Sequence, residues 1–220
     1  MIAFGGNETT IDDKRHKRAR AAANSPAHLL EYKKPEGRLN ILGFWLFLAT
    51  DLVLFACLFA TYLVLRTHVD GGPSDHALFE PYGFMAETII LLTSSFTGSL
   101  IIYEMRNHNR QRMLGWMVVT VLLGVLFVGY EAYEFFNYAA SGATMGRSAF
   151  LSAFFTLVGT HGGHVTLGII WMISVMTQVA KYGIDADTAR KSFIVGLYWH
   201  FLDIVWVFIF TVVYMTGVVS

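Results

Sequence analysis

Five side chains that can bind or transfer protons stand inside long apolar stretches of this 220-residue chain: Asp51, His161, His164, His200 and Asp203. An ionisable group at the centre of an apolar helix is costly unless it has a partner or a function. His161 and His164 have a spacing with which two imidazoles can bind one metal ion, and His200 and Asp203 are also three residues apart. These residue types leave three interpretations open: structural hydrogen bonding, proton conduction and metal binding.

The elements that must position these side chains are membrane helices. The chain is 55% hydrophobic and 15% charged, whereas a soluble domain carries about a quarter charged residues. Crossing the hydrocarbon core takes about 20 mostly apolar residues, and lipid requires backbone polar groups to be paired within the segment. Five stretches satisfy this condition: 39–65, 82–103, 113–136, 150–180 and 193–219. We therefore predict an all-α, polytopic membrane protein with five transmembrane helices.

The uneven distribution of lysine and arginine predicts the direction of these helices. Fourteen of the 16 lie in the stretch up to Arg38 or in the links after the second and fourth helices, and only Arg66 and Arg147 lie on the other side. Basic residues are retained on the cytoplasmic side of a membrane. We therefore predict that the amino terminus is cytoplasmic and the carboxyl terminus is outside. Residues 1–38 would form a polar, basic cytoplasmic tail, and residues 39–220 the transmembrane bundle.

Two further features exclude whole classes of function. Cys57 is the one cysteine, so the chain has neither an internal disulfide framework nor a cysteine-based metal site. The basic run 14–20 has no folded or aromatic neighbourhood with which to bind nucleic acid, so we expect it to lie near anionic lipid instead.

Depth in the membrane separates the polar residues into two sets. At a rise of about 1.5 Å per residue, the five side chains named first all fall near the midplane of the bilayer. Glu87, Glu131 and Glu134 lie nearer the outer face. Asp51 has no polar partner on its own helix, so we expect it to reach His161 or His164 on the fourth.

One side of the fourth helix carries polar residues, and the opposite side carries small residues. His161 and His164 share one face, and Gly159 and Gly163 form a small pair on roughly the opposite face. Such a pair lets another helix approach closely. We therefore expect the fourth helix to be central, with protein on both sides.

Several motifs resemble subunit III of the haem-copper terminal oxidases. Residues 159–168 read GTHGGHVTLG, and residues 198–206 read YWHFLDIVW. Residues 43–47 read GFWLF ahead of Asp51, where many members of that family have glutamate. SSFT at 94–97 and EAYEF at 131–135 also match, and the resemblance runs in order over about residues 37–220.

Within that family the chain is most similar to the bacterial quinol-oxidase branch, of the cytochrome bo type. Five helices rather than seven, Asp51, and RSAFLSAFF at 147–155 carry this resemblance. It implies an accessory subunit of a quinol-oxidising, proton-pumping complex in the bacterial inner membrane. Subunit III of a cytochrome c or menaquinol oxidase is the nearest alternative, and a free-standing proton or small-solute transporter is an alternative of another class.

The resemblance also implies what this chain binds. Haem and copper belong to subunit I in this family, so we expect no catalytic, cofactor-binding or metal-binding residue here, and the midplane histidines to be hydrogen-bonded structure. The implied partners are subunit I as the main contact, subunits II and IV, and membrane phospholipid.

Overall fold

The structure is a computed structural model that describes residues 31, 35–66, 81–142 and 144–215. Apart from short turns, the described part is helical, and it contains no strands. Its helices are α2 (Pro35–Leu65), α4 (Pro81–Arg106), α5 (Arg110–Ala140), α6 (Ala149–Tyr182) and α7 (Ala186–Ile209), and α7 continues into the π-helical segment η3 (Phe210–Met215). All five are long and apolar enough to cross a membrane. The predicted all-α class with five transmembrane helices is therefore confirmed.

The helices extend beyond the apolar stretches, and the largest difference is at the fifth. α7 begins at Ala186 rather than at residue 193, because Thr188 accepts a hydrogen bond from the backbone N–H of Asp185 (2.8 Å) and so caps the helix start. α2 and α4 begin with Pro35 and Pro81. Proline suits the first helical position because the missing N–H would have no partner there.

The predicted tail at residues 1–38 falls mostly outside the described residues. Within it, α2 already begins at Pro35, so the last residues of that stretch are helical. Glu31 is buried, and its carboxylate lies 2.8 Å from the guanidinium of Arg106. The residues after 215 are likewise outside the described part, so the predicted end of the fifth helix at 219 is not tested.

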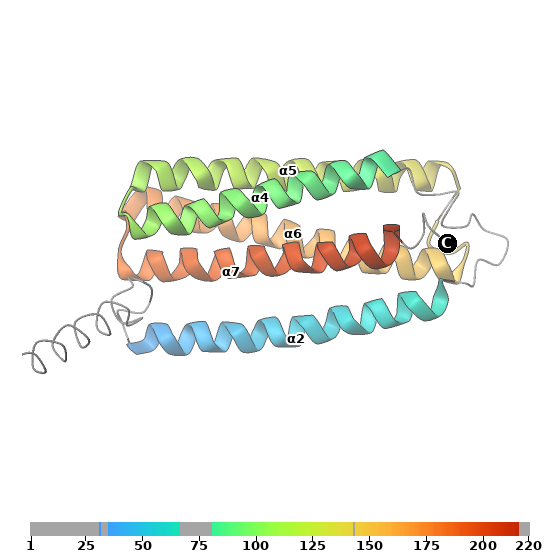
Figure 1. Cartoon of the computed structure of the whole chain (residues 1–220), viewed down its shortest axis with the longest axis horizontal. Helices are drawn as coiled ribbons and strands as arrows, with labels where there is room; N and C mark the ends of the chain where they lie inside the picture. Colours follow the sequence, from blue (N-terminus) through green and yellow to red (C-terminus); the bar gives the residue numbers. More distant parts are fainter. Residues whose placement is uncertain (1–30, 32–34, 67–80, 143, 216–220) are drawn as a thin grey trace, which may run out of the picture.

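The helices run up and down, with α6 and α7 in the middle of the bundle (Figure 1). α6 contacts α2, α5 and α7, whereas α7 contacts α2, α4 and α6. α4 and α5 pack against each other along most of their length and are joined by a short turn in which His108 has a φ of 56°. The expected central place of α6 is confirmed, but α7 shares it.

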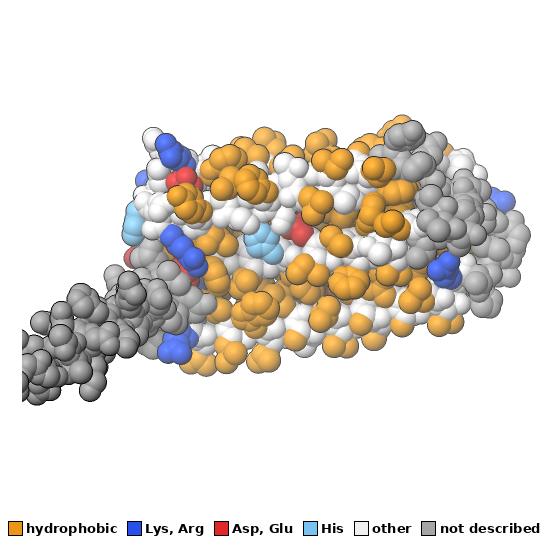
Figure 2. All heavy atoms as spheres, in the orientation of Figure 1, with side chains coloured by type: hydrophobic (Ala, Val, Ile, Leu, Met, Phe, Trp, Pro, Cys, Tyr) orange, Lys and Arg blue, Asp and Glu red, His pale blue; other side chains and the backbone are white. Residues whose placement is uncertain are grey.

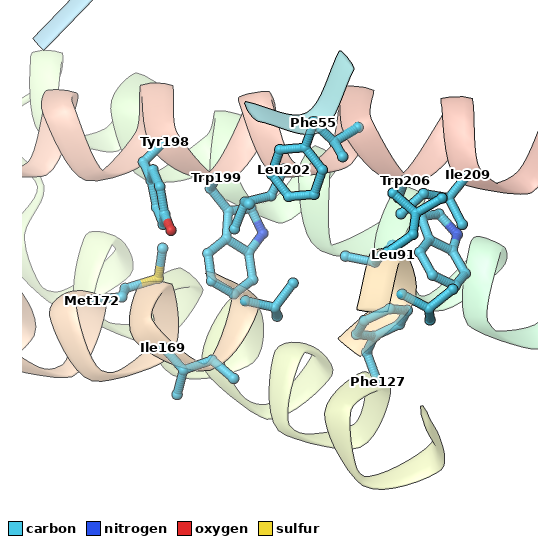
Figure 3. Packing of buried hydrophobic residues seen from close by; sticks show 14 of the residues in the cluster. Phe55, Leu91, Phe127, Ile169, Met172, Tyr198, Trp199, Leu202, Trp206 and Ile209 are labelled. Carbon is cyan, nitrogen blue, oxygen red and sulfur yellow. The ribbon is translucent and has the colours of Figure 1, made fainter. Parts of the chain in front are cut away.

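Large aromatic side chains fill the centre of the bundle. Figure 3 shows Trp199 and Trp206 entering the core from α7, with Phe127 facing Trp206. The rings of Phe127 and Trp206 meet edge to face, with centroids 4.8 Å apart. Trp199 fits because α5 and α6 have glycine where it lies: a Cβ at Gly124 would be 2.7 Å from Cη2 of Trp199, and a Cβ at Gly168 would be 3.3 Å from Cζ3. The packing of α7 against α5 and α6 thus depends on the absence of a side chain at Gly124 and Gly168.

Hydrogen bonds across helices fix the same core. Nε1 of Trp199 donates to Oγ of Ser94 (2.9 Å), and Nε1 of Trp206 donates to Oγ1 of Thr88 (3.1 Å). Both acceptors lie on α4. Hydrocarbon offers no alternative donor or acceptor, so these bonds set the rotation of α7 relative to α4.

The expectation of protein on both sides of α6 holds at Gly159, which faces Phe135 of α5, but it is wrong at Gly163 within the part of the chain that the structure describes. Gly163 is exposed, and a Cβ there would meet nothing within 4 Å. At Gly159 the nearest atom would be Cε2 of Phe135, at 3.4 Å. α6 turns its histidine face inward, and this places the opposite, small-residue face on the outside of the bundle.

Candidate functional site: a buried polar layer

Asp51 and His164 form a pair between α2 and α6. Nε2 of His164 lies 3.3 Å from Oδ1 of Asp51, and Asp51 is buried. Helix periodicity places Asp51 on the same side of α2 as the buried Leu48, Phe55 and Tyr62, which pack into the core. Depth in the membrane left His161 and His164 as candidate partners of Asp51, and in the structure His164 is the partner.

The other ring nitrogen of His164 restricts the protonation of this pair. Nδ1 lies 2.7 Å from the backbone oxygen of Thr160, and a carbonyl oxygen only accepts, so Nδ1 carries the proton. Nε2 of a neutral His164 then has no proton, and a favourable contact with Asp51 requires one more. That proton is either on the carboxyl group, opposite a neutral imidazole, or on Nε2, opposite a carboxylate. The geometry therefore fits a single proton between Nε2 of His164 and Oδ1 of Asp51.

His161 is completely buried and lies among aromatic rings. Its ring stacks on Trp206 with centroids 5.4 Å apart, and Phe55 and Phe127 contact it edge-on at 6.3 and 6.0 Å. Neither ring nitrogen has a hydrogen-bond partner among the described residues. His161 therefore does not join Asp51 and His164 in one polar cluster, although it precedes His164 by only one helical turn.

His200 and Asp203 form a second polar group, between α7 and α4. Nδ1 of His200 lies 3.0 Å from Oγ of Ser95, and Nε2 lies 3.4 Å from Oγ of Ser99. Nδ1 is also 3.7 Å from Oδ2 of Asp203, but neither oxygen of that carboxyl group accepts a hydrogen bond from a described residue. The serines of α4, rather than Asp203, are the main partners of His200.

The carboxylates expected nearer the outer face, Glu87, Glu131 and Glu134, lie toward the start of α4 and the end of α5. Glu87 and Glu131 are buried, and their side-chain oxygens have no hydrogen-bond partner among the described residues. The hydroxyl of Tyr138 donates to Oε2 of Glu134 (3.4 Å). α6 makes room for Glu131 with Gly162, where a Cβ would overlap the carboxylate.

These residues do not converge on a metal ion or a reaction centre. The part of the chain that the structure describes contains no group of three or more His, Cys, Asp or Glu side chains that could hold a metal. The polar layer is instead divided into an α2–α6 pair, an isolated histidine and an α4–α7 group. Such an arrangement can tie helices together and hold protons.

Sequence reasoning missed the polar residues of α4 as partners of the histidine and tryptophan side chains of α7. Ser95 and Ser99 are one helical turn apart and contact His200, and Ser94 holds Trp199. A run of serines inside an apolar segment was the available signal, because Ser and Thr in membrane helices commonly bond to a neighbouring helix. No pattern in the sequence predicted the ion pair of Glu31 with Arg106.

Comparison with known proteins identifies the family. The model of the family described as cytochrome c oxidase subunit III matches residues 35–218, which include all five helices and both histidine motifs. The quinol oxidase subunit 3 of Bacillus spizizenii is 49% identical over 195 residues, which are 89% of this chain and 94% of that protein. The cytochrome c oxidase subunit 3 of Bacillus sp. PS3 is 52% identical over 186 residues, 84% of this chain and 89% of that one. A probable quinol oxidase subunit 3 of Staphylococcus epidermidis is 48% identical over 194 residues, 88% and 96% of the two chains. The chain therefore belongs to the cytochrome c oxidase subunit III family, as its motifs predicted.

Proposed function

We propose that this chain is the non-catalytic subunit III of a proton-pumping haem-copper quinol oxidase in a bacterial inner membrane. The observation that carries the proposal is the family match over residues 35–218, because it covers the whole helical bundle without a break. In this assignment the chain packs against subunit I, which holds the haems and copper, and also meets subunits II and IV. Its role is to support assembly, phospholipid binding and sustained proton uptake by the complex.

The buried polar residues form separate small groups rather than one reaction centre, and this supports an accessory role. The Asp51–His164 pair and the His200–Ser95 contact each join two helices of the chain, as structural hydrogen bonds do. The orientation in the proposal, with a cytoplasmic amino terminus, rests on the 14-to-2 distribution of Lys and Arg. The ends of α4 and α6 and the starts of α2, α5 and α7 lie at one end of the bundle (Figure 1). The basic residues described there gather on that side: Arg38, Arg106, Arg110, Arg112, Lys181, Arg190 and Lys191.

This proposal and its nearest alternative differ in the electron donor of the complex, which is quinol in the first and cytochrome c in the second. Quinol as the donor is supported by the relatives named quinol oxidase subunit 3. A cytochrome c oxidase is the second candidate, because the relative of that name from Bacillus sp. PS3 is 52% identical. The comparisons offer no support for a free-standing transporter.

The proposal is tested by purifying the complex through a tag on the carboxyl terminus in mild detergent. The chain should bring haem absorbance and larger oxidase subunits with it, and the purified complex should consume oxygen with a quinol rather than with reduced cytochrome c. Isolation of a stable, haem-free monomer contradicts the subunit assignment. Oxygen consumption with cytochrome c alone contradicts only the assignment of the donor.

A further inference from the structure

A pocket opens between α4 and α5 at the end of the bundle where a short turn joins these two helices. This α4–α5 pocket has a volume of about 480 Å³ and is lined by Glu104, Arg112, Gly115, Trp116 and Val119. Glu104 lies roughly 3 Å from the end of α4, and Arg112 lies roughly 3 Å from the start of α5. Figure 2 shows basic and acidic side chains gathered at this end of the molecule, next to a mostly hydrophobic surface. The polar part of the pocket is therefore at the level of the membrane surface, on the side predicted to be cytoplasmic.

The two charged side chains of the α4–α5 pocket have no partner within the described part of the chain. Glu104 is 8% exposed, yet no described residue forms a hydrogen bond or ion pair with its carboxylate. Arg112 is exposed, and its guanidinium likewise pairs with no described residue, Glu104 included. The neighbouring Arg106, in contrast, is held by Glu31. A buried carboxylate requires a partner, so the pocket suits a ligand that brings a cation to Glu104 and an anion to Arg112.

The α4–α5 pocket continues from these charges toward the hydrocarbon. Gly115, Trp116 and Val119 lie between roughly 7 and 14 Å from the start of α5, measured along the helix. A Cβ at Gly115 would meet nothing within 4 Å, and Val119 is 38% exposed, so this wall is open and apolar. Tryptophan is enriched where the headgroups of a membrane meet its hydrocarbon. The pocket thus has the same order as a phospholipid, with charges at the surface and apolar contact below them.

The charged end of the pocket favours one class of phospholipid. The guanidinium of Arg112 matches the phosphate that every phospholipid carries. The carboxylate of Glu104 only accepts hydrogen bonds, so it requires a donor. The primary ammonium of an ethanolamine headgroup brings a positive charge and three N–H donors. The quaternary ammonium of choline has no N–H, and a glycerol headgroup has no positive charge.

We propose that the α4–α5 pocket binds phosphatidylethanolamine, with the ammonium group at Glu104, the phosphate at Arg112 and an acyl chain along Gly115 and Val119. This inference rests on the proposed function, because it gives the phospholipid binding included there a site and a headgroup. The bound lipid supplies the partner that Glu104 and Arg112 lack in the chain.

Photolabelling of the purified complex tests the site. The complex is reconstituted in phosphatidylcholine vesicles that contain a trace of phosphatidylethanolamine with a diazirine in one acyl chain. After irradiation, labelled peptides are identified by mass spectrometry. The label should fall on the stretch 115–119 of α5. Unlabelled phosphatidylethanolamine added to the vesicles should reduce this labelling more than the same amount of phosphatidylglycerol does.

Two substitutions test the headgroup contacts. Glu104→Gln keeps the size of the side chain but removes the negative charge, and Arg112→Gln removes the cation. Each should reduce labelling of the pocket by about three- to tenfold, as expected for the loss of one charge-assisted hydrogen bond. Asp187→Asn is the matched control, because Asp187 is an acidic residue at the same end of the bundle that pairs with Arg190 and lies outside the pocket. This control should leave the labelling unchanged.

Several outcomes overturn the inference. Equal competition by phosphatidylglycerol and phosphatidylethanolamine, or unchanged labelling of Glu104→Gln, overturns the headgroup. A label confined to other helices overturns the site, and so does a benzophenone amino acid at Val119 that crosslinks to another polypeptide rather than to lipid. If haem still copurifies in these cases, the proposed function stands and only the lipid site is wrong. Absence of haem-bearing subunits from the preparation is instead the failure of the proposed function.

Discussion

Gly124 on α5 provides a direct test of how the bundle is packed. A Cβ added there would lie 2.7 Å from Cη2 and 3.1 Å from Cζ2 of Trp199, and 3.2 Å from Cγ1 of Ile169. Carbon atoms in contact prefer separations of about 3.5–4.0 Å. Trp199 has little room to withdraw, because it is 2% exposed and its Nε1 is bonded to Ser94. Gly124→Ala therefore overpacks a rigid site.

The magnitude follows from the two ways in which the structure can respond. If the helices separate slightly to admit the methyl group, overpacking lowers the free energy of unfolding by about 1–3 kcal/mol. If Trp199 moves instead, its hydrogen bond with Ser94 is lost, which costs about 1 kcal/mol. Either response makes Gly124→Ala less stable than the unaltered chain by at least about 1 kcal/mol.

Gly129→Ala is the matched control, since it is the same substitution on the same helix. A Cβ at Gly129 would meet nothing within 4 Å, and the position is exposed. Unfolding in detergent leaves membrane helices largely helical, so the usual helix propensity advantage of alanine has little effect. We expect the control to change the free energy of unfolding by less than about 0.5 kcal/mol.

The assay is unfolding of the isolated chain, carrying a fluorescent fusion, in a mild detergent to which increasing fractions of sodium dodecyl sulfate are added. The Gly124→Ala variant should unfold at a lower fraction than either the unaltered chain or Gly129→Ala. If Gly124→Ala proves as stable as Gly129→Ala, then Trp199 does not lie against α5 as described, and the packing argument is refuted.

The remaining predictions concern the buried polar layer. His161→Phe should leave the stability of the chain unchanged or slightly raised, because the imidazole lies among aromatic rings and has no hydrogen-bond partner among the described residues. His164→Phe should lower the free energy of unfolding by about 1–3 kcal/mol, because Asp51 then loses its partner. The same detergent titration compares the two variants, and a larger loss at His161 would contradict the assignment. Asp203→Leu should weaken retention of the chain in the complex more than Asp51→Asn does, measured by the amount copurified with a tagged subunit I, and neither should abolish the haem spectrum. The isolated chain should contain less than one metal ion per molecule by elemental analysis, and one tightly held ion that is lost in His164→Ala would overturn the structural interpretation of the histidines.

The number and class of the helices were predictable because lipid imposes a length and a composition on every crossing. The ends were less predictable. α7 starts at Ala186 through a cap made by Thr188, within a segment that contains Asp187, Arg190 and Lys191, so a search for apolar runs starts the helix too late. The motifs around His161 and His200 indicated the family. Depth in the membrane left two candidate partners for Asp51, His161 and His164, which are one helical turn apart.

The choice between those histidines was made by tertiary packing. Both project from one face of α6, but His164 meets α2 at Asp51 while His161 is enclosed by Trp206 and Phe127 from α7 and α5. Which residues lie at the same depth can be read from the order of residues alone, because rise per residue is a property of a single helix. Which of them touch depends on the rotation of each helix about its axis. That rotation is set by contacts between helices, such as the bond from Trp199 to Ser94 and the close approach at Gly124, which no single segment specifies.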